Sequence, residues 1–207
     1  MYPETGGKMK RSYFILFTVC SLLFSVLLWG CGAGPGAPGS SGSEDTGINI
    51  KSVSITRTDG PDLDVFSDPT GCDGEPETLL TRKDATITIG AEKLNATSTF
   101  DPFPASVEAC TITYRKAIED PSSPTIESWI FYPNCTLISG TNTCNVQLID
   151  IDRLGDYWNA LTSHEPAEVP THYIASYKCT YMNNYGDSGT FETEYDIWLA
   201  DFLMCGG

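Results

Sequence analysis

Carboxylate side chains are concentrated in one stretch of the chain that is also rich in glycine and proline. Calcium binds six to eight oxygen ligands, and carboxylates on a loop can supply several of them. The stretch lacks the twelve-residue spacing of an EF-hand. The first interpretation is therefore a solvated loop without a cofactor, and the alternative is a calcium site that includes Asp62, Asp64 and Asp68. The acidic residues of this stretch, 58–78, are Asp59, Asp62, Asp64, Asp68, Asp73, Glu75 and Glu77.

Aromatic side chains offer a second kind of chemistry, which is stacking against sugar rings. Trp198 is the strongest candidate, because it falls on the opposite side of an alternating segment from Ile197 and Leu199. Aromatic residues of β-proteins more often pack in the core or pair across strands. A glycan-binding surface is therefore the alternative to a structural role. The other candidates are Trp129, Tyr132, Tyr157, Trp158 and Tyr185.

A catalytic serine is the third chemistry to weigh. Residues 186–189, Gly-Asp-Ser-Gly, resemble the tetrapeptide around the nucleophile of chymotrypsin-like serine proteases. That chemistry needs a histidine that hydrogen-bonds the serine and an acid behind the histidine. The chain has two histidines, His164 and His172, and neither follows the Ala-His-Cys pattern of that family. We interpret the tetrapeptide as a hairpin turn, and the sequence favours a binding or structural module over an enzyme.

The first 31 residues have the three-part organisation of an export signal: a basic start, a short apolar run and a small-residue cleavage point. Residues 28–31, Leu-Trp-Gly-Cys, resemble the lipobox of bacterial lipoproteins, which has an aliphatic residue three positions before the cysteine and a small residue directly before it. The resemblance implies cleavage after Gly30 and lipid attachment at Cys31. The alternative is a retained membrane anchor, because the apolar run approaches the length that spans a bilayer. The basic residues are Lys8, Lys10 and Arg11, and the apolar run is 13–28.

The chain is predicted to have three parts. Residues 1–30 are the signal peptide, 31–47 are the lipidated cysteine and a linker, and 48–207 are one domain. The linker is almost entirely Gly, Ala, Pro and Ser, a composition typical of a flexible tether with an average span of about 20–25 Å. Gly32 is not an inner-membrane retention residue, so we expect the outer membrane of the cell envelope where a cell has two membranes.

The charge of the mature chain limits its partners. Removal of residues 1–30 takes away three basic residues and one acid, which leaves 9 Lys and Arg against 26 Asp and Glu, a formal charge of −17. Such a charge argues against nucleic acid and against electrostatic docking on anionic lipid. The expected partners are the membrane, through the lipid anchor, and an envelope protein or a glycan.

Six cysteines remain after the signal is removed and Cys31 is acylated. An even number of cysteines in an exported domain indicates disulfide bonds, and six allow fifteen pairings. Cys135 and Cys144 flank turn-forming residues, so we predict a local bridge between them. No Cys-x-x-Cys motif is present, which argues against thioredoxin-like chemistry. The six are Cys72, Cys110, Cys135, Cys144, Cys179 and Cys205.

Apolar residues of the domain recur with a period of two, which predicts half-buried strands. A change of parity near Lys51 predicts a bulge in the first strand. The last two strands are predicted to form a hairpin, because Asn and Gly residues lie between them. Leu154, Tyr157, Trp158 and Leu161 have helical spacing, with Asp150 or Asp152 as the cap. The predicted strands are 48–55, 85–89, 110–114, 127–132, 144–151, 173–181 and 191–199.

Seven strands and one short helix favour an all-β, antiparallel sandwich. Tyr177-Lys178-Cys179 resembles the Tyr-x-Cys of the penultimate strand in immunoglobulin domains, and Trp129 lies between Cys110 and Cys179. The resemblance implies an immunoglobulin-like β-sandwich in which a Cys110–Cys179 bridge joins the two sheets. Elimination then leaves Cys72 paired with Cys205.

Overall fold

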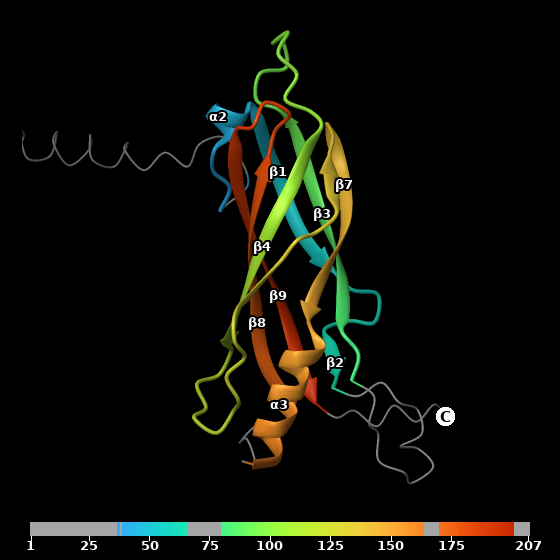
Figure 1. Cartoon of the computed structure of the whole chain (residues 1–207), viewed down its shortest axis with the longest axis vertical. Helices are drawn as coiled ribbons and strands as arrows, with labels where there is room; N and C mark the ends of the chain where they lie inside the picture. The colour runs from blue at the N-terminus through green and yellow to red at the C-terminus, as the bar shows by residue number, and fades with distance from the viewer. Residues whose placement is uncertain (1–36, 38, 66–79, 164–169, 201–207) are drawn as a thin grey trace, which may run out of the picture. The chain divides into compact units, whose positions relative to one another are not determined.

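The protein is a β-sandwich, described by a computed structural model for residues 37, 39–65, 80–163 and 170–200 (Figure 1). Three strands form one sheet in the order β1-β3-β7, and six form the other, in which β2-β9-β8-β4-β5 lie side by side and β6 also pairs with β4. The small sheet contains β1 (Ile48–Thr56), β3 (Lys83–Lys93) and β7 (Gly140–Ile149). The large sheet contains β2 (Asp62–Asp64), β4 (Ala105–Lys116), β5 (Trp129–Phe131), β6 (Cys135–Leu137), β8 (Thr171–Met182) and β9 (Ser188–Ala200).

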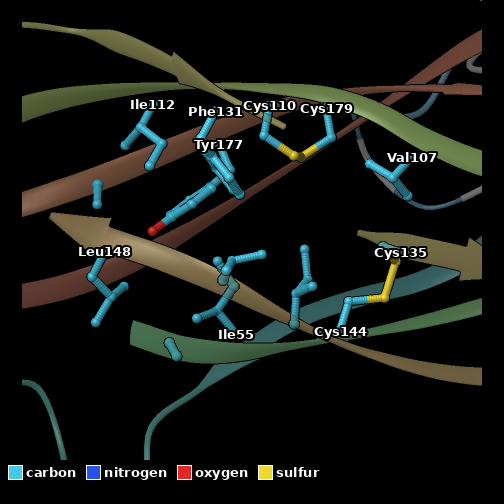
Figure 2. Packing of buried hydrophobic residues seen from close by; sticks show 14 of the residues in the cluster. Ile55, Val107, Cys110, Ile112, Phe131, Cys135, Cys144, Leu148, Tyr177 and Cys179 are labelled. Atoms are coloured by element: carbon cyan, nitrogen blue, oxygen red, sulfur yellow. A yellow bond between two sulfur atoms is a disulfide. The ribbon is translucent and has the colours of Figure 1, made fainter. Parts of the chain in front are cut away.

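The core lies between the two sheets and follows the period-two pattern of the sequence. Alternate residues of β3 are buried, from Ala85 to Ala91, while the threonines between them face outward. The large sheet contributes Ile112, Phe131 and Tyr177, which pack toward Ile55 and Leu148 of the small sheet (Figure 2). The predicted all-β sandwich is confirmed, because each face that alternation made apolar is buried against the other sheet.

Two local predictions are also confirmed. The pairing of β1 with β3 changes register between Ile50 and Ser52, which places the bulge at Lys51. Strands β8 and β9 form an antiparallel hairpin with an unbroken register from Thr171↔Leu199 to Met182↔Ser188. Asn183 closes its turn, because its side-chain oxygen accepts the backbone N–H groups of Tyr185 and Asp187, each at 2.9 Å.

The predicted helix is α3 (Ile151–Ser163). Asp150 caps it: its Oδ1 accepts the backbone N–H of Arg153 at 2.9 Å, which satisfies one of the unpaired donors in the first turn. A second helix, α2 (Ser43–Thr46), is one turn long and precedes β1 directly. Among the described residues, no helix has both the length and the apolar character needed to cross a membrane.

The strand count and the purely antiparallel arrangement were predicted incorrectly. Strands β2 and β6 are only three residues long, so neither gives a periodic signal in the sequence. Strand β2 also runs parallel to β9, with Leu63 opposite Leu199. It adds a short parallel edge to a sheet that is otherwise antiparallel, because the chain after β1 crosses to the far end of β9.

The Cys110–Cys179 bridge is present, but it does not join the two sheets. The two cysteines are direct neighbours on β4 and β8, in the same sheet, with their Cα atoms 4.0 Å apart. The expected inter-sheet position is therefore wrong. Both residues do face the core, as alternation predicted, but they do so side by side.

The predicted Cys135–Cys144 bridge is also present. It joins the two sheets, which was the role expected of the Cys110–Cys179 bridge. Cys135 lies on β6 of the large sheet and Cys144 on β7 of the small sheet, so this bridge crosses the core (Figure 2). It is local in sequence and connects the two layers in space. The two disulfides indicate an oxidising, extracytoplasmic compartment. Cys72 and Cys205 lie outside the described residues.

The domain was predicted to begin at residue 48, but the folded unit begins earlier in the chain. Ser41 exchanges two backbone hydrogen bonds with Thr190 of β9, at 2.9 and 3.1 Å. Thr46 is fully buried, and its backbone oxygen accepts a hydrogen bond from the Asn183 side chain at 3.0 Å. Residues 39–47 therefore belong to the sandwich and not to the flexible linker in which composition placed them.

Candidate functional site

The outward face of the large sheet places Trp198 beside two polar partners. Trp198 points away from Ile197 and Leu199, which are fully buried on the other side of β9, so the predicted orientation is confirmed. Its cross-strand neighbour on β8 is His172. Asp196 lies two residues before Trp198 and faces the same way. These three side chains form what is called here the Trp198 platform.

The platform is ordered by stacking and by one polar contact. The His172 and Trp198 rings are nearly parallel, with an interplanar angle of 10° and centroids 4.0 Å apart. His172 Nε2 lies 2.8 Å from Asp196 Oδ1, which fixes the orientation of the imidazole. Both rings remain partly exposed. The register of the β8–β9 hairpin makes His172 a partner of Trp198, and sequence reasoning predicted the hairpin but did not use its register.

Further polar side chains continue from the platform along β8 and β9. Lys178 pairs with Glu192 at 3.0 Å, and Ser176 donates its hydroxyl to Glu194 at 2.8 Å. Arg115 of β4 reaches Glu194 at 3.7 Å. Exposed ion pairs of this kind contribute little to stability. Their carboxylates are therefore available as hydrogen-bond acceptors for a ligand laid along the sheet.

Tyr195 lies between Glu194 and Asp196 in the sequence but packs against the core on the other face of β9, and its pKa reflects the charges at this end of the sheet. Burial raises the pKa of the Tyr195 hydroxyl, the positive charge of Arg57 opposes that rise, and the charges of Asp196 and Asp62 add to it. Asp62 is the neighbour of Trp198 on β2. The platform is thus bordered by carboxylates, with one guanidinium close by.

The structure places two of the three predicted calcium ligands on strand β2. Asp62 and Asp64 flank Leu63, which is fully buried, so both carboxylates face away from the core. The backbone oxygen of Asp62 accepts a hydrogen bond from Arg57 at 2.9 Å. Asp68 lies outside the described residues. Within the described part of the chain, no group of three or more His, Cys, Asp or Glu residues could hold a metal ion.

The other candidate aromatics are dispersed. Tyr157 of α3 is buried and donates its hydroxyl to the backbone oxygen of Leu199 at 3.0 Å. Trp158 packs partly against the core. Tyr132 follows β5 and is 78% exposed, and Tyr185 lies in the β8–β9 turn and is 61% exposed. Trp198 is the candidate that projects from the outward face of the large sheet with carboxylates at two neighbouring strand positions.

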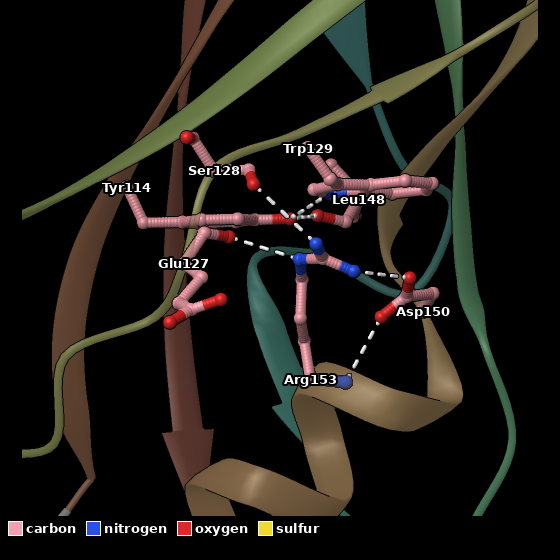
Figure 3. A network of polar contacts seen from close by, with 7 residues as sticks. All are labelled: Tyr114, Glu127, Ser128, Trp129, Leu148, Asp150 and Arg153. Carbon is pink, nitrogen blue, oxygen red and sulfur yellow. Dashed lines mark hydrogen bonds and ion pairs between the residues drawn. The ribbon is translucent and has the colours of Figure 1, made fainter.

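Trp129 belongs to a polar network that sequence reasoning also missed (Figure 3). Arg153 of α3 lies over the Trp129 ring at 5.1 Å and pairs with Asp150 at 2.6 Å. The Trp129 indole donates to the Tyr114 hydroxyl at 3.0 Å, and Tyr114 donates to the backbone oxygen of Leu148 at 2.5 Å. Burial raises the pKa of Tyr114 well above its ordinary value. The network connects α3 and both sheets, so its role is structural.

The Gly-Asp-Ser-Gly tetrapeptide is the β8–β9 turn and the start of β9, as interpreted. Ser188 pairs with Met182 at one end of the hairpin, and His172 pairs with Trp198 at the other. Ten residues of strand separate them, which is about 33 Å. The two side chains therefore cannot form a catalytic pair. His164 lies outside the described residues.

One polar hollow was not anticipated. It has a volume of about 430 Å³ and lies where β1 ends and β3 begins. Its two arginines are already paired with neighbouring carboxylates, Arg57 with Asp59 at 3.3 Å and Arg82 with Asp84 at 3.1 Å. Threonine hydroxyls form much of the remaining wall. No aromatic residue lines it, so the hollow offers hydrogen bonds but no stacking surface.

The chain matches no protein-family model and no curated protein, so the Trp198 platform is interpreted from its own geometry.

Proposed function

We propose that this protein is a lipid-anchored module of the bacterial cell envelope that binds or supports a partner and does not catalyse a reaction. The observation that carries the proposal is the pair of disulfides in the core, which require an oxidising compartment, downstream of the lipobox-like residues that end at Cys31. The fold is a variant of the immunoglobulin-like sandwich with its Cys110–Cys179 bridge inside one sheet.

The anchor itself can be tested at Cys31. We expect chain isolated from bacterial membranes to begin at Cys31 and to carry the added mass of fatty acyl groups. Several acyl chains bind a membrane stably. A serine has no thiol group to which the lipid could be attached. The Cys31→Ser variant should therefore lack the added mass and should leave the membrane fraction. Its two described disulfides should still form, which serves as the folding control.

A chain that keeps residues 1–30 and stays in the membrane without acyl groups would point to the retained anchor instead. In a cell with two membranes, the lipidated chain is expected in the outer membrane, because Gly32, which follows the lipidated cysteine, is not an inner-membrane retention residue. Fractionation of inner and outer membranes distinguishes these two locations.

Carbohydrate binding is the second candidate function, and the Trp198 platform favours it. A partly exposed indole offers a flat apolar surface for the C–H groups of a sugar ring, and Asp196 and Glu194 can accept hydrogen bonds from its hydroxyls. The alternation that turns Trp198 outward and the register that places His172 beside it give this surface a fixed geometry.

Replacement of Trp198 by alanine should weaken glycan binding by about five- to ten-fold, since a stacking contact is worth about 1–1.5 kcal/mol. The measurement is binding of the purified chain to a glycan array, followed by titration of the strongest ligand. Tyr132→Ala is the matched control, because Tyr132 is more exposed and lies away from the platform on the β5 side. Equal losses in the two variants, or no glycan bound by the parent chain, would exclude this function.

A further inference from the structure

The chain enters the sandwich at one end and is fixed there by both sheets. The N–H of Ala37 donates to the backbone oxygen of Ile50 on β1, and Ser41 pairs with Thr190 on β9. The segment between these contacts therefore crosses from the edge of the small sheet to the edge of the large sheet. This entry point lies only six residues after Cys31.

The short distance along the chain limits how far the domain can stand from a lipidated Cys31. Six residue steps of 3.3–3.6 Å span at most about 22 Å. Ala37 and Gly39 lie beside residues 192–194 of β9. Along β9 this level is about 7–13 Å from Thr190 and about 20–26 Å from Ala200. The end of the sandwich that holds Ser41 and Thr190 is therefore the nearer of the two ends to the point where the tether begins.

Three connections meet at this end: α2, the β3–β4 connection of residues 94–104, and the β8–β9 turn of residues 183–187 (Figure 1). Asn183 of the turn bonds the backbone of Thr46 in α2 at 3.0 Å. Asn184 bonds the backbone oxygens of Asp101 and Phe103 at 3.2 and 3.0 Å. The hydrogen bonds hold the three connections as one surface.

Two aromatic rings project from that surface. Phe100 is 40% exposed and Tyr185 is 61% exposed, and their rings stack with centroids 4.6 Å apart. Phe100 also packs on Gly47, where a Cβ atom would lie 2.9 Å from the phenyl ring. Exposed aromatic area of this size is unfavourable in water, whereas aromatic side chains partition readily to the headgroup level of a membrane.

The charges around the pair favour a zwitterionic lipid surface over an anionic one. Glu44 and Asp45 lie in α2, Asp101 follows Phe100 and Asp187 is the last residue of the turn, and all four are exposed. Lys93 forms an ion pair with Asp101 at 3.5 Å. Among the described residues, this is the only ion pair in which any of the four carboxylates takes part. An acidic rim is repelled by anionic headgroups and is tolerated by neutral ones.

We propose that Phe100 and Tyr185 form a membrane-contacting foot, on which the anchored domain stands with the two rings at the headgroup level of a zwitterionic bilayer. The inference rests on the proposed lipid anchor at Cys31. It also has a consequence for the Trp198 platform, which lies about 33 Å along the hairpin from the foot and is thereby presented away from the membrane.

The foot is tested with the lipidated full chain in phosphatidylcholine vesicles. Tyr185→Trp places a reporter in the foot, and Tyr132→Trp places a matched reporter on an exposed site beyond β5, about halfway along β4. The added emission of each variant over the parent chain is compared in ordinary vesicles and in vesicles with brominated acyl chains. We expect bromine to quench the emission added by Tyr185→Trp about two-fold or more, and to leave that of Tyr132→Trp unchanged.

The mass of the vesicle-bound chain is measured first, which separates the two proposals. Unlipidated chain would contradict the anchor and remove the foot with it. Lipidated chain with no quenching of Tyr185→Trp, or with equal quenching of the two reporters, would overturn the foot and leave the anchor intact. Replacement of phosphatidylcholine by phosphatidylglycerol should reduce the quenching, and an increase would contradict the argument from charge.

Discussion

Replacement of both Cys110 and Cys179 by alanine is expected to lower the free energy of unfolding by about 4 kcal/mol, which for a domain of this size is about 10 °C in melting temperature. The bridge closes a loop of 69 residues, and its main effect is to restrict the unfolded chain. Both cysteines are also buried in the core, so the variant loses packing as well. The change is measured by denaturant unfolding in buffer without a reducing or an oxidising agent, so that the remaining disulfides stay intact.

The Cys135→Ala/Cys144→Ala variant is the matched control, because it removes a disulfide of similar burial. Its loop has a sequence separation of only 9, and the loss expected from chain entropy is about 2.7 kcal/mol. The order of the two effects is informative because the shorter loop carries the bridge that joins the sheets. A larger loss from Cys135 and Cys144 would show that holding the layers together matters more than restricting the unfolded chain.

The roles of these two bridges show where sequence reasoning reaches its limit. The alternating pattern correctly predicted that Cys110 and Cys179 face the core, because the face on which a residue lies depends only on its position in its own strand. Whether two inward cysteines face each other across the core or lie side by side depends on the order of strands in each sheet. That order is set by long-range pairing, which the spacing of the residues does not reveal.

The entry segment gives a second example, in which composition has two physical meanings. Glycine-rich sequence is typical of a flexible tether, but glycine is also required where backbones approach closely. Gly42 has a φ of +79°, and a Cβ atom there would lie 2.7 Å from the Cα of Gly189. The glycines that predicted a linker are in part what allows residues 39–47 to dock on β9.

The candidate site could be predicted only in part for the same reason. The parity of β9 places Trp198 outward, and the sequence alone was sufficient for that. His172 is 26 positions away in the sequence and becomes a stacking partner because the register of the hairpin places it opposite. The acidic neighbour Asp62 comes from β2, a strand too short to give a periodic signal.

Stability is expected to fall steeply above about pH 10, because the core contains tyrosines whose hydroxyl groups must stay protonated. Tyr177 donates to the backbone oxygen of Gln147 at 2.7 Å, and Tyr114 donates to Leu148 on the same strand, so two hydroxyls of the large sheet bond the small sheet. Burial is the largest cause that raises the pKa of each of these tyrosines: Tyr114, Tyr157, Tyr173, Tyr177 and Tyr181.

The direction of the effect follows from which state holds the protons. The unfolded chain releases each phenolic proton near the ordinary pKa of about 10, whereas the folded chain keeps it to a higher pH. The stabilisation is therefore complete below pH 10 and is lost as the pH rises from there through the raised pKa values. Between its unfolded and folded pKa each tyrosine contributes at most about 1.4 kcal/mol per pH unit, so the five together contribute at most about 7 kcal/mol per unit. A domain of ordinary stability should unfold cooperatively near pH 11–12.

The measurement is a titration followed by circular dichroism of the strands and by tyrosinate absorbance. The two signals should change together for the buried tyrosines, because their hydroxyls ionise only when the core opens. Tyr177→Phe removes one of the five groups and should reduce the steepness of the alkaline transition by about one fifth, while the lost hydrogen bond lowers stability at neutral pH by about 1 kcal/mol. If all the tyrosines ionised gradually from pH 10 while the strands stayed intact, the hydroxyls would not hold the two sheets together. The disulfides would then remain as the covalent connection, with Cys135–Cys144 the one that crosses between the layers.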